Sequence, residues 1–175
     1  QMCIETDHVT GTDISRVAIE YGLAKYGDLD LQVQPAEELA FADGQFDAVL
    51  SFDLFEHIAR IDRHVSEVRR VLKPKGYYLF QTPNKYSNAP FETLAHRSLK
   101  WRRYHPSLHT PRQLRRRLVA HGFDVQFAKM NAINEVTGTK LQKLGPCGSL
   151  VARVNCEKLP LVLQTNLYVV AQRKD

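Results

Sequence analysis

Apolar segments alternate along this chain with segments of helical periodicity, and this alternation constrains the fold more than any other feature. Phe46–Phe52 is a nearly continuous apolar run, which is typical of a strand buried on both faces of a parallel sheet. Four apolar residues then recur at helical spacing between positions 61 and 72, and Tyr77–Phe80 is a second buried strand. The pattern predicts an α/β fold, a doubly wound and mostly parallel sheet with helices on both faces.

The remaining elements follow from shorter patterns. Further strands are expected at Val9–Asp13, Leu31–Gln34, Phe123–Phe127 and, antiparallel and last, Leu167–Ala171; a helix is expected at Ser15–Lys25. Thr110, Pro111 and Gln113 predict the capping box of a further helix, which Gly122 ends. A polar loop at 84–88 and an irregular stretch to 108 precede it, and 131–163 is expected to hold an inserted helical segment.

Length and composition place the chain among folded globular domains. With 175 residues, of which 43% are hydrophobic and 25% charged, a single domain over 1–175 can bury a core. No apolar run approaches the roughly 20 residues that cross a bilayer, and the first residues lack the pattern of a signal peptide. Three cysteines without metal-ligand spacing indicate reduced thiols and a cytoplasmic location.

An acid, Asp13, ends the first expected strand and is followed by Ile14. Ligands of open parallel sheets bind beyond the carboxyl ends of the strands. A carboxylate there can accept hydrogen bonds from both hydroxyls of a ribose, and Ile14 can pack against an adenine. The alternative is that Asp13 is the N-cap of the following helix, where acids are common.

Four later segments, taken in order, resemble class I S-adenosylmethionine-dependent methyltransferases. Residues 36–49 (AEELAFADGQFDAV) look like the family's stretch from the third strand into the fourth, and SFDLFEHI at 51–58 is similar to its fourth-strand motif. VLKPKG at 71–76 matches the turn before the fifth strand, with Lys75 where a glycine is usual. TPNK at 82–85 is similar to the ubiquinone-pathway O-methyltransferase subgroup, and the resemblance runs from about Val9 to Phe123.

The resemblance implies S-adenosylmethionine as cofactor and methyl transfer, by in-line displacement, to a small-molecule or lipid-like acceptor. It implies that Asp13 holds the ribose and that Ile14 packs on the adenine. Ala36 and Glu37 would lie at the adenine edge. Pro35 stands where the family often has an acid, so the backbone N–H groups of the two residues after it are expected to recognise the base.

The resemblance also places Phe52 and Asp53 at the methionine end of the cofactor, with plain core packing as the alternative for Phe52. One part of the family's site is not found. The family's glycine-rich turn lies roughly 20 residues before the ribose acid, whereas only twelve residues precede Asp13, with Gly11 as their one glycine. The expectation is therefore that the sequence begins after the first strand, which would lie between the strands at Val9 and Phe46, and that the domain is incomplete at its N-terminus.

A hydroxyl acceptor would need a general base, and two histidines are candidates. His57 follows the strand at Phe46–Phe52 at the ligand end of the sheet, and histidine titrates near neutral pH. His109 lies within 84–122, the expected lid and substrate region. The alternative for His57 is a helix-start residue bonded to Glu56 or to backbone. No metal site is predicted, because no third ligand accompanies His105 and His109.

Residues 97–117 carry eight Lys/Arg and no acid, and KWRRYH at 100–105 interleaves aromatics with cations. The simplest interpretation of this segment is a solvated helix face, and contact with an anionic substrate or an anionic membrane surface is the first alternative. RNA is a less favoured partner, and a solvated helix face is the simplest interpretation of Arg115–Arg117.

Two other functions stay open: a non-catalytic binding protein on a methyltransferase scaffold, and an RNA methyltransferase that uses 97–117. A nucleotide-dependent oxidoreductase shares the acid after a strand, but it does not explain the segments at 36–58 or the TPN turn at 82–84.

Overall fold

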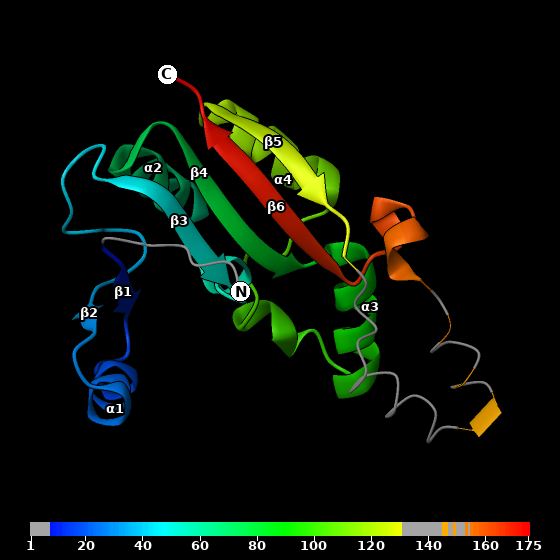
Figure 1. Ribbon diagram of the computed structural model, residues 1–175. Helices are drawn as coiled ribbons and strands as arrows, with labels where there is room; N and C mark the ends of the chain where they lie inside the picture. The colour runs from blue at the N-terminus through cyan, green and yellow to red at the C-terminus, as the bar shows by residue number, and fades with distance from the viewer. Residues whose placement is uncertain (1–7, 131–144, 147–148, 150–152, 154) are drawn as a thin grey trace.

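The strands are divided between two sheets, seen in the computed structural model of Figure 1, which describes residues 8–130, 145–146, 149, 153 and 155–175. In the smaller sheet, β1 (Thr10–Asp13) and β2 (Asp30–Val33) are parallel and are connected by α1 (Arg16–Tyr26). The larger sheet has the order β3-β4-β6-β5. Its members are β3 (Phe46–Phe52), β4 (Leu72–Pro83), β6 (Asn166–Arg173) and β5 (Phe123–Ala128).

Strand directions in the larger sheet follow the predicted topology. β3 is parallel to β4, and β6 runs antiparallel to both β4 and β5. The predicted α/β fold and its antiparallel last strand are therefore confirmed, and β3 has the bounds expected from the sequence. The segment expected to be helical at 131–163 lies mostly outside the described residues; its described part includes two short 3₁₀ helices, η3 (Cys156–Lys158) and η4 (Leu161–Leu163).

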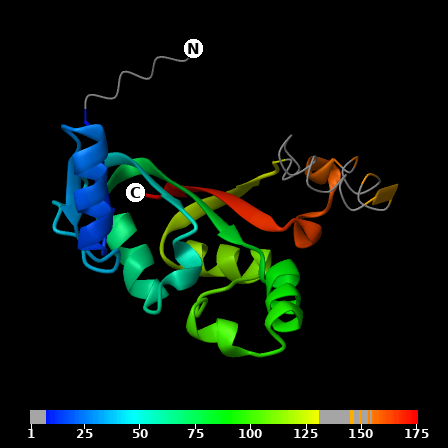
Figure 2. The same cartoon turned by 90° about the horizontal axis from the view of Figure 1, so that it is seen from below.

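The core lies between the larger sheet and two helices, α2 (Ile61–Val71) and α4 (Pro111–Ala120), which cover the same face (Figures 1 and 2). Tyr78 and Phe80 of β4 point into this layer, as do alternate residues of β5 and β6. Leu114 and Leu118 of α4 are fully buried there. Both halves of the predicted capping box of α4 form, and Gly122 follows the helix with φ of 80°, a conformation that favours glycine.

The opposite face of the larger sheet contradicts the prediction that the strands at 46–52 and 77–80 are buried on both faces. Leu50, Phe52 and Tyr77 are exposed on that face. Tyr77 is followed by the buried Tyr78, and Leu50 and Phe52 alternate with half-buried residues. Within the described part of the chain, α2 and α4 cover only the face that contains Tyr78. β3 is also the edge strand of its sheet.

A helix, α3 (Lys85–His96), replaces the polar loop and irregular stretch expected after residue 83. The prediction was wrong because Pro90 lies inside the segment and its apolar residues do not form a core-facing stripe. The helix begins at a cap that tertiary structure fixes, Asn84. Two short 3₁₀ helices complete this end of the molecule, η1 (Phe55–His57) after β3 and η2 (Lys100–Arg103) after α3.

Asn84 joins the end of β4, the start of α3 and residues 161–164. Its side chain is fully buried and donates to the carbonyl oxygens of Gln164 at 2.8 Å, Leu161 at 3.2 Å and Val162 at 3.3 Å. Its Oδ1 accepts from the N–H of Tyr86 at 3.1 Å, which caps α3. The asparagine of the TPN turn is thus a structural residue with both its donor and its acceptor in use.

Replacing Asn84 by aspartate is expected to lower the free energy of unfolding by about 3 kcal/mol, because a carboxylate oxygen would face carbonyl oxygens that need a donor. Asn155→Asp is the matched control, since among the described residues the side chain of Asn155 accepts one hydrogen bond at Oδ1, from the N–H of Glu157, and donates none, and aspartate keeps that acceptor. Urea denaturation measures both. Equal stability of the two variants would contradict this role for Asn84.

None of the helices in the described residues has both the length and the apolar character required to cross a bilayer.

Candidate cofactor and acceptor site

Asp13 lies exposed at the carboxyl end of β1, and among the described residues one of its carboxylate oxygens has no hydrogen-bond partner. Oδ1 accepts the N–H of Ser15 at 2.7 Å. Ser15, not Asp13, is the N-cap of α1, because its side chain accepts from Ala18. The capping alternative for Asp13 is therefore wrong. Ile14, the next residue, is 74% exposed, so none of the described residues buries its apolar side chain.

The chain returns to Asp13 at the end of β2. The carbonyl of Asp13 accepts the N–H of Gln34 at 3.0 Å, so the turn that begins at Pro35 starts beside the acid. Within the described part of the chain, the N–H groups of Ala36 and Glu37 donate to no other group, whereas that of Glu38 donates to Pro35. Two open N–H groups near an open carboxylate oxygen suit a planar base and its attached ribose.

Side chains of one face of α2 hold this turn and the loop after it. Arg63 Nε donates to the carbonyl of Glu37 at 2.9 Å, and Arg70 donates to the carbonyls of Leu39 and Phe41, each at 2.7 Å. Glu67 accepts the N–H of Leu39 at 2.9 Å. Arg70 bonding lowers the pKa of the Glu67 carboxyl, and Glu67 in turn raises the pKa of Arg70. Positions 63, 67 and 70 share a helix face, which fixes the loop on a rigid element.

A buried hydrogen-bond chain connects the same loop to the strands of the larger sheet. His64, 3% exposed, donates from Nδ1 to the carbonyl of Ala36 at 2.8 Å, which leaves Nε2 to accept from the hydroxyl of Tyr78 at 3.0 Å. The Tyr78 hydroxyl accepts in turn from Ser51 Oγ of β3 at 2.8 Å. Burial lowers the pKa of His64 and raises the pKa of Tyr78, so both are neutral near pH 7.

Acidification is expected to destabilise the fold through His64. Its pKa is lower in the folded chain than in the unfolded one, so its contribution to stability is present above about pH 6.5 and is lost as the pH falls below that value. The comparison protein is His64→Gln, in which position 64 cannot titrate. It keeps His109, a second histidine whose pKa is lowered by burial, so the two proteins differ only in the titration of His64. Between pH 7 and pH 5 the free energy of unfolding should therefore fall more steeply for the unsubstituted protein than for His64→Gln. The difference between the two slopes should be at most about 1.4 kcal/mol per pH unit. Parallel pH dependences would exclude this role.

Phe52 and Asp53 lie at the carboxyl end of β3. Phe52 is 63% exposed, so it is not part of the core formed by the described residues. Asp53 has φ of 48°, in the left-handed region that few residues other than glycine, asparagine and aspartate adopt, and its N–H donates to Gln81 Oε1 at 3.2 Å. Within the described residues no hydrogen bond or ion pair joins Phe52 or Asp53 to Asp13, so the predicted residues form two groups, one per sheet.

His57 in η1 presents one free ring nitrogen. Nδ1 donates to the carbonyl of Tyr104 at 2.7 Å, which leaves Nε2 unprotonated in the neutral ring. Glu56 Oε1 lies 3.9 Å from Nε2, and the side chain of His57 is 47% exposed. The backbone bond expected as the alternative exists, but it orients the ring in the tautomer that a base requires.

The carboxylate of Glu56 was not predicted as part of the site. Its side chain is 3% exposed and accepts from Thr82 Oγ1 of β4 at 3.1 Å. A buried carboxylate near His57 would stabilise an imidazolium formed by proton transfer. The sequence signal was present in the Glu56-His57 pair, but only the strand order brings Thr82 beside it.

His109 is a weaker candidate because it is buried. It is 8% exposed, its Nδ1 donates to the carbonyl of Ser107 at 2.5 Å, and its ring lies 5.7 Å from that of Phe55. Burial lowers its pKa. It pairs with Asn84 as an isolated β-bridge, so it lies at the carboxyl end of β4 but below the surface.

The basic segment 97–117 divides into two parts. On α4, Arg115 donates to the carbonyl of Val125 at 2.8 Å and its guanidinium lies over the ring of Phe127, while Arg117 is ion-paired with Asp62. These arginines therefore stabilise the fold rather than form a free basic face. Around η2, in contrast, Arg97, Lys100, Arg102 and Arg103 are not buried.

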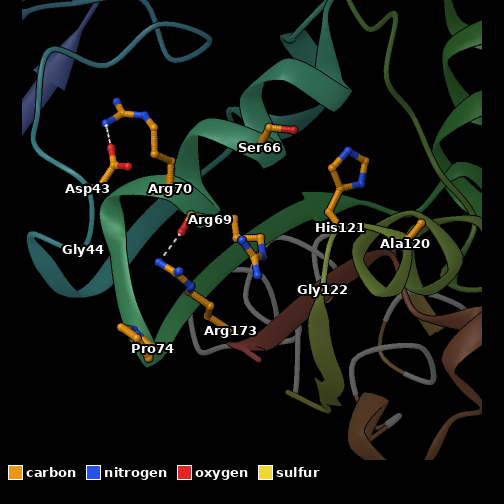
Figure 3. A pocket seen from close by; sticks show the side chains of 10 residues that line it. All are labelled: Asp43, Gly44, Ser66, Arg69, Arg70, Pro74, Ala120, His121, Gly122 and Arg173. Carbon is orange, nitrogen blue, oxygen red and sulfur yellow. Dashed lines mark hydrogen bonds and ion pairs between the residues drawn. The ribbon is translucent and has the colours of Figure 1, made fainter. Parts of the chain in front are cut away.

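A cavity of about 740 Å³ lies at the amino ends of β3 and β4, and none of the site residues predicted from the sequence lines it (Figure 3). Arg173 Nη1 donates to the carbonyl of Arg69 at 3.0 Å, and Arg70 is ion-paired with Asp43 at 2.8 Å. The arginines that line this cavity thus stabilise the C-terminal turn of α2. Ligands of such sheets bind at the opposite edge, so this cavity is not the candidate site.

Comparison with known proteins gives the same picture. Residues 2–80 match the model of a methyltransferase domain. The chain is 36% identical over 81 residues to a ubiquinone biosynthesis O-methyltransferase of Brucella anthropi (44% of this chain, 33% of that protein). It is 30% identical over 104 residues to a fatty-acid O-methyltransferase of Mycolicibacterium smegmatis (53% and 38%). The chain thus spans little more than a third of the length of these relatives.

The fold matches a solved S-adenosylmethionine-dependent methyltransferase of Mesorhizobium loti, with a TM-score of 0.65 at 16% identity over 95% of this chain and 80% of that one. Residues 2–80 are therefore similar to a methyltransferase domain, and the chain shares its fold with a solved S-adenosylmethionine-dependent methyltransferase.

Proposed function

We propose that this chain binds S-adenosylmethionine at the carboxyl ends of β1 and β3 and transfers its methyl group to a small or lipid-like acceptor. The observation that carries the proposal is the group at the end of β1 and β2, where the open Asp13 oxygen and the N–H groups of Ala36 and Glu37 point to a ribose and an adenine. Phe52 and Asp53 would contact the methionine end.

The site needs one more element, and the sheets have a place for it. β1 is an edge strand of the smaller sheet and β3 is an edge strand of the larger one, and the two do not pair with each other. A parallel strand between them would satisfy the free backbone groups of both edges. We propose that such a strand, followed by a glycine-rich turn, completes the cofactor site.

The bound cofactor supplies a methyl group on a sulfonium, already activated for displacement, so the chain's own work is positioning and proton handling. His57 would accept the proton of an acceptor hydroxyl at Nε2, and Glu56 would stabilise the charge that results. The region 84–122 would form the acceptor side of the site, because α3 and the loop before α4 follow the carboxyl end of β4.

A transfer assay tests the proposed activity. The full-length gene product is incubated with tritium-methyl S-adenosylmethionine and, separately, a phenolic acceptor, a fatty acid and total RNA. Label in the phenolic or fatty acid fraction, and none in RNA, is expected. Label in RNA alone would favour the RNA methyltransferase, and cofactor binding without transfer to any acceptor would favour the non-catalytic scaffold.

A further inference from the structure

Apolar side chains project into solvent from the lobe formed by α3, η2 and the residues between them, residues 85–104, here named the α3–η2 lobe. Leu94 is 81% exposed, the highest value among the large hydrophobic residues described, and Phe91, Leu99 and Tyr104 are 67%, 53% and 70% exposed. Phe91 and Leu94 are three residues apart on α3 and so share a face. Exposed apolar residues grouped in this way mark an interaction surface.

The fold of the lobe does not depend on these residues. Trp101 is buried and its Nε1 donates to Thr93 Oγ1 at 2.8 Å, which ties η2 to α3. Between the two helices lies a mainly apolar cavity of about 570 Å³ that Leu94, Leu99 and Trp101 line. The lobe therefore presents a preformed apolar surface on a fixed base.

Cations surround the apolar surface. Arg97 and Arg102 line the same cavity, and the guanidinium of Arg102 lies over the ring of Trp101, 5.6 Å from its centroid. Lys100 and Arg103 are the first and last residues of η2. Glu92 is the one acid in the sequence between Glu67 and Asp124, so the lobe carries a net positive charge. Apolar and aromatic side chains mixed with Lys and Arg are what an anionic lipid interface binds, through inserted side chains and attracted cations.

We infer that the α3–η2 lobe docks on the surface of an anionic phospholipid bilayer. Phe91, Leu94 and Leu99 enter the interface, and the cations contact lipid phosphates. Arg115 and Arg117 of α4 take no part, because they bind within the fold. The acid-free run 97–117 thus contains one membrane-facing part and one structural part. Vesicle binding needs no cofactor, so this surface and the methyl-transfer proposal can fail separately.

Vesicle flotation of the full-length protein tests the inference. Binding is expected to vesicles of phosphatidylcholine with about a third phosphatidylglycerol, and not to pure phosphatidylcholine. The double substitution Arg102→Gln/Arg103→Gln is expected to lower the partition coefficient by roughly 25-fold, about fivefold per cation. Leu94→Ser/Leu99→Ser should lower it by at least roughly tenfold.

Arg112→Gln/Arg116→Gln is the matched control, since it removes the same charge from exposed positions of α4 and should leave binding within about twofold. Circular dichroism confirms that each variant is folded. The inference is overturned if neutral vesicles bind equally well, if the α4 control loses as much binding as the η2 pair, or if RNA competes the protein off the vesicles through the same arginines.

Discussion

Alanine in place of His57 is expected to lower kcat for an acceptor hydroxyl by roughly 10²- to 10⁴-fold, the usual contribution of a general base. The bond from Nδ1 to the carbonyl of Tyr104 leaves Nε2 as the proton acceptor, and the buried carboxylate of Glu56 lies 3.9 Å away to stabilise the protonated ring. Because the ring contributes nothing to the proposed ribose and adenine contacts, binding of S-adenosylhomocysteine should be unchanged.

Two comparisons separate a base from a structural residue. With a phenol acidic enough to be ionised at the assay pH, the loss in His57→Ala should shrink to less than about tenfold, because no proton has to be removed. His121→Ala is the control. The His121 ring also bonds a backbone carbonyl, that of Arg117, but it lies at the C-terminal end of α4, away from His57. An equal loss with both acceptors would show that His57 acts through structure alone.

The sequence predicts the elements whose signals are local. The run at 46–52 gives β3 its bounds, and Thr110 with Gln113 marks the start of α4, because a side-chain cap and a strand's apolar run need no distant partner. The antiparallel last strand and the parallel pairing of β3 with β4 follow from the family resemblance.

The wrong predictions share a physical cause: each concerns a feature that depends on residues far away in the sequence. α3 contains Pro90 and has a weak apolar stripe, yet it forms because Asn84 is bonded to carbonyls about 80 residues later. The two-sided burial expected for 46–52 depends on what lies against each face, and the composition of the strand alone cannot report it.

The candidate site divides in the same way. Asp13 and Ile14 could be proposed from their position at the end of a strand, and Phe52 and Asp53 from the family resemblance. The structure leaves all four exposed. His64, which bonds the carbonyl of Ala36, could not, because a lone histidine on a helix carries no sign of a partner 28 residues earlier. Glu56 likewise gains its role only when β4 places Thr82 beside it.

Asp13→Ala is expected to weaken binding of S-adenosylhomocysteine by roughly 100-fold, because the two hydrogen bonds that a carboxylate accepts from a ribose diol are charge-assisted and contribute about 1.5 kcal/mol each. Asp47→Ala is the matched control. It removes the same charge from an exposed acid at the amino end of β3, where Asp47 pairs with Lys73. It should bind the ligand as the unsubstituted protein does.

Isothermal titration of the full-length gene product with S-adenosylhomocysteine therefore tests the central claim, that the end of β1 holds the cofactor's ribose. The account predicts measurable binding that Asp13→Ala weakens about 100-fold and Asp47→Ala leaves intact. Absence of binding, or equal affinity in all three proteins, would contradict it.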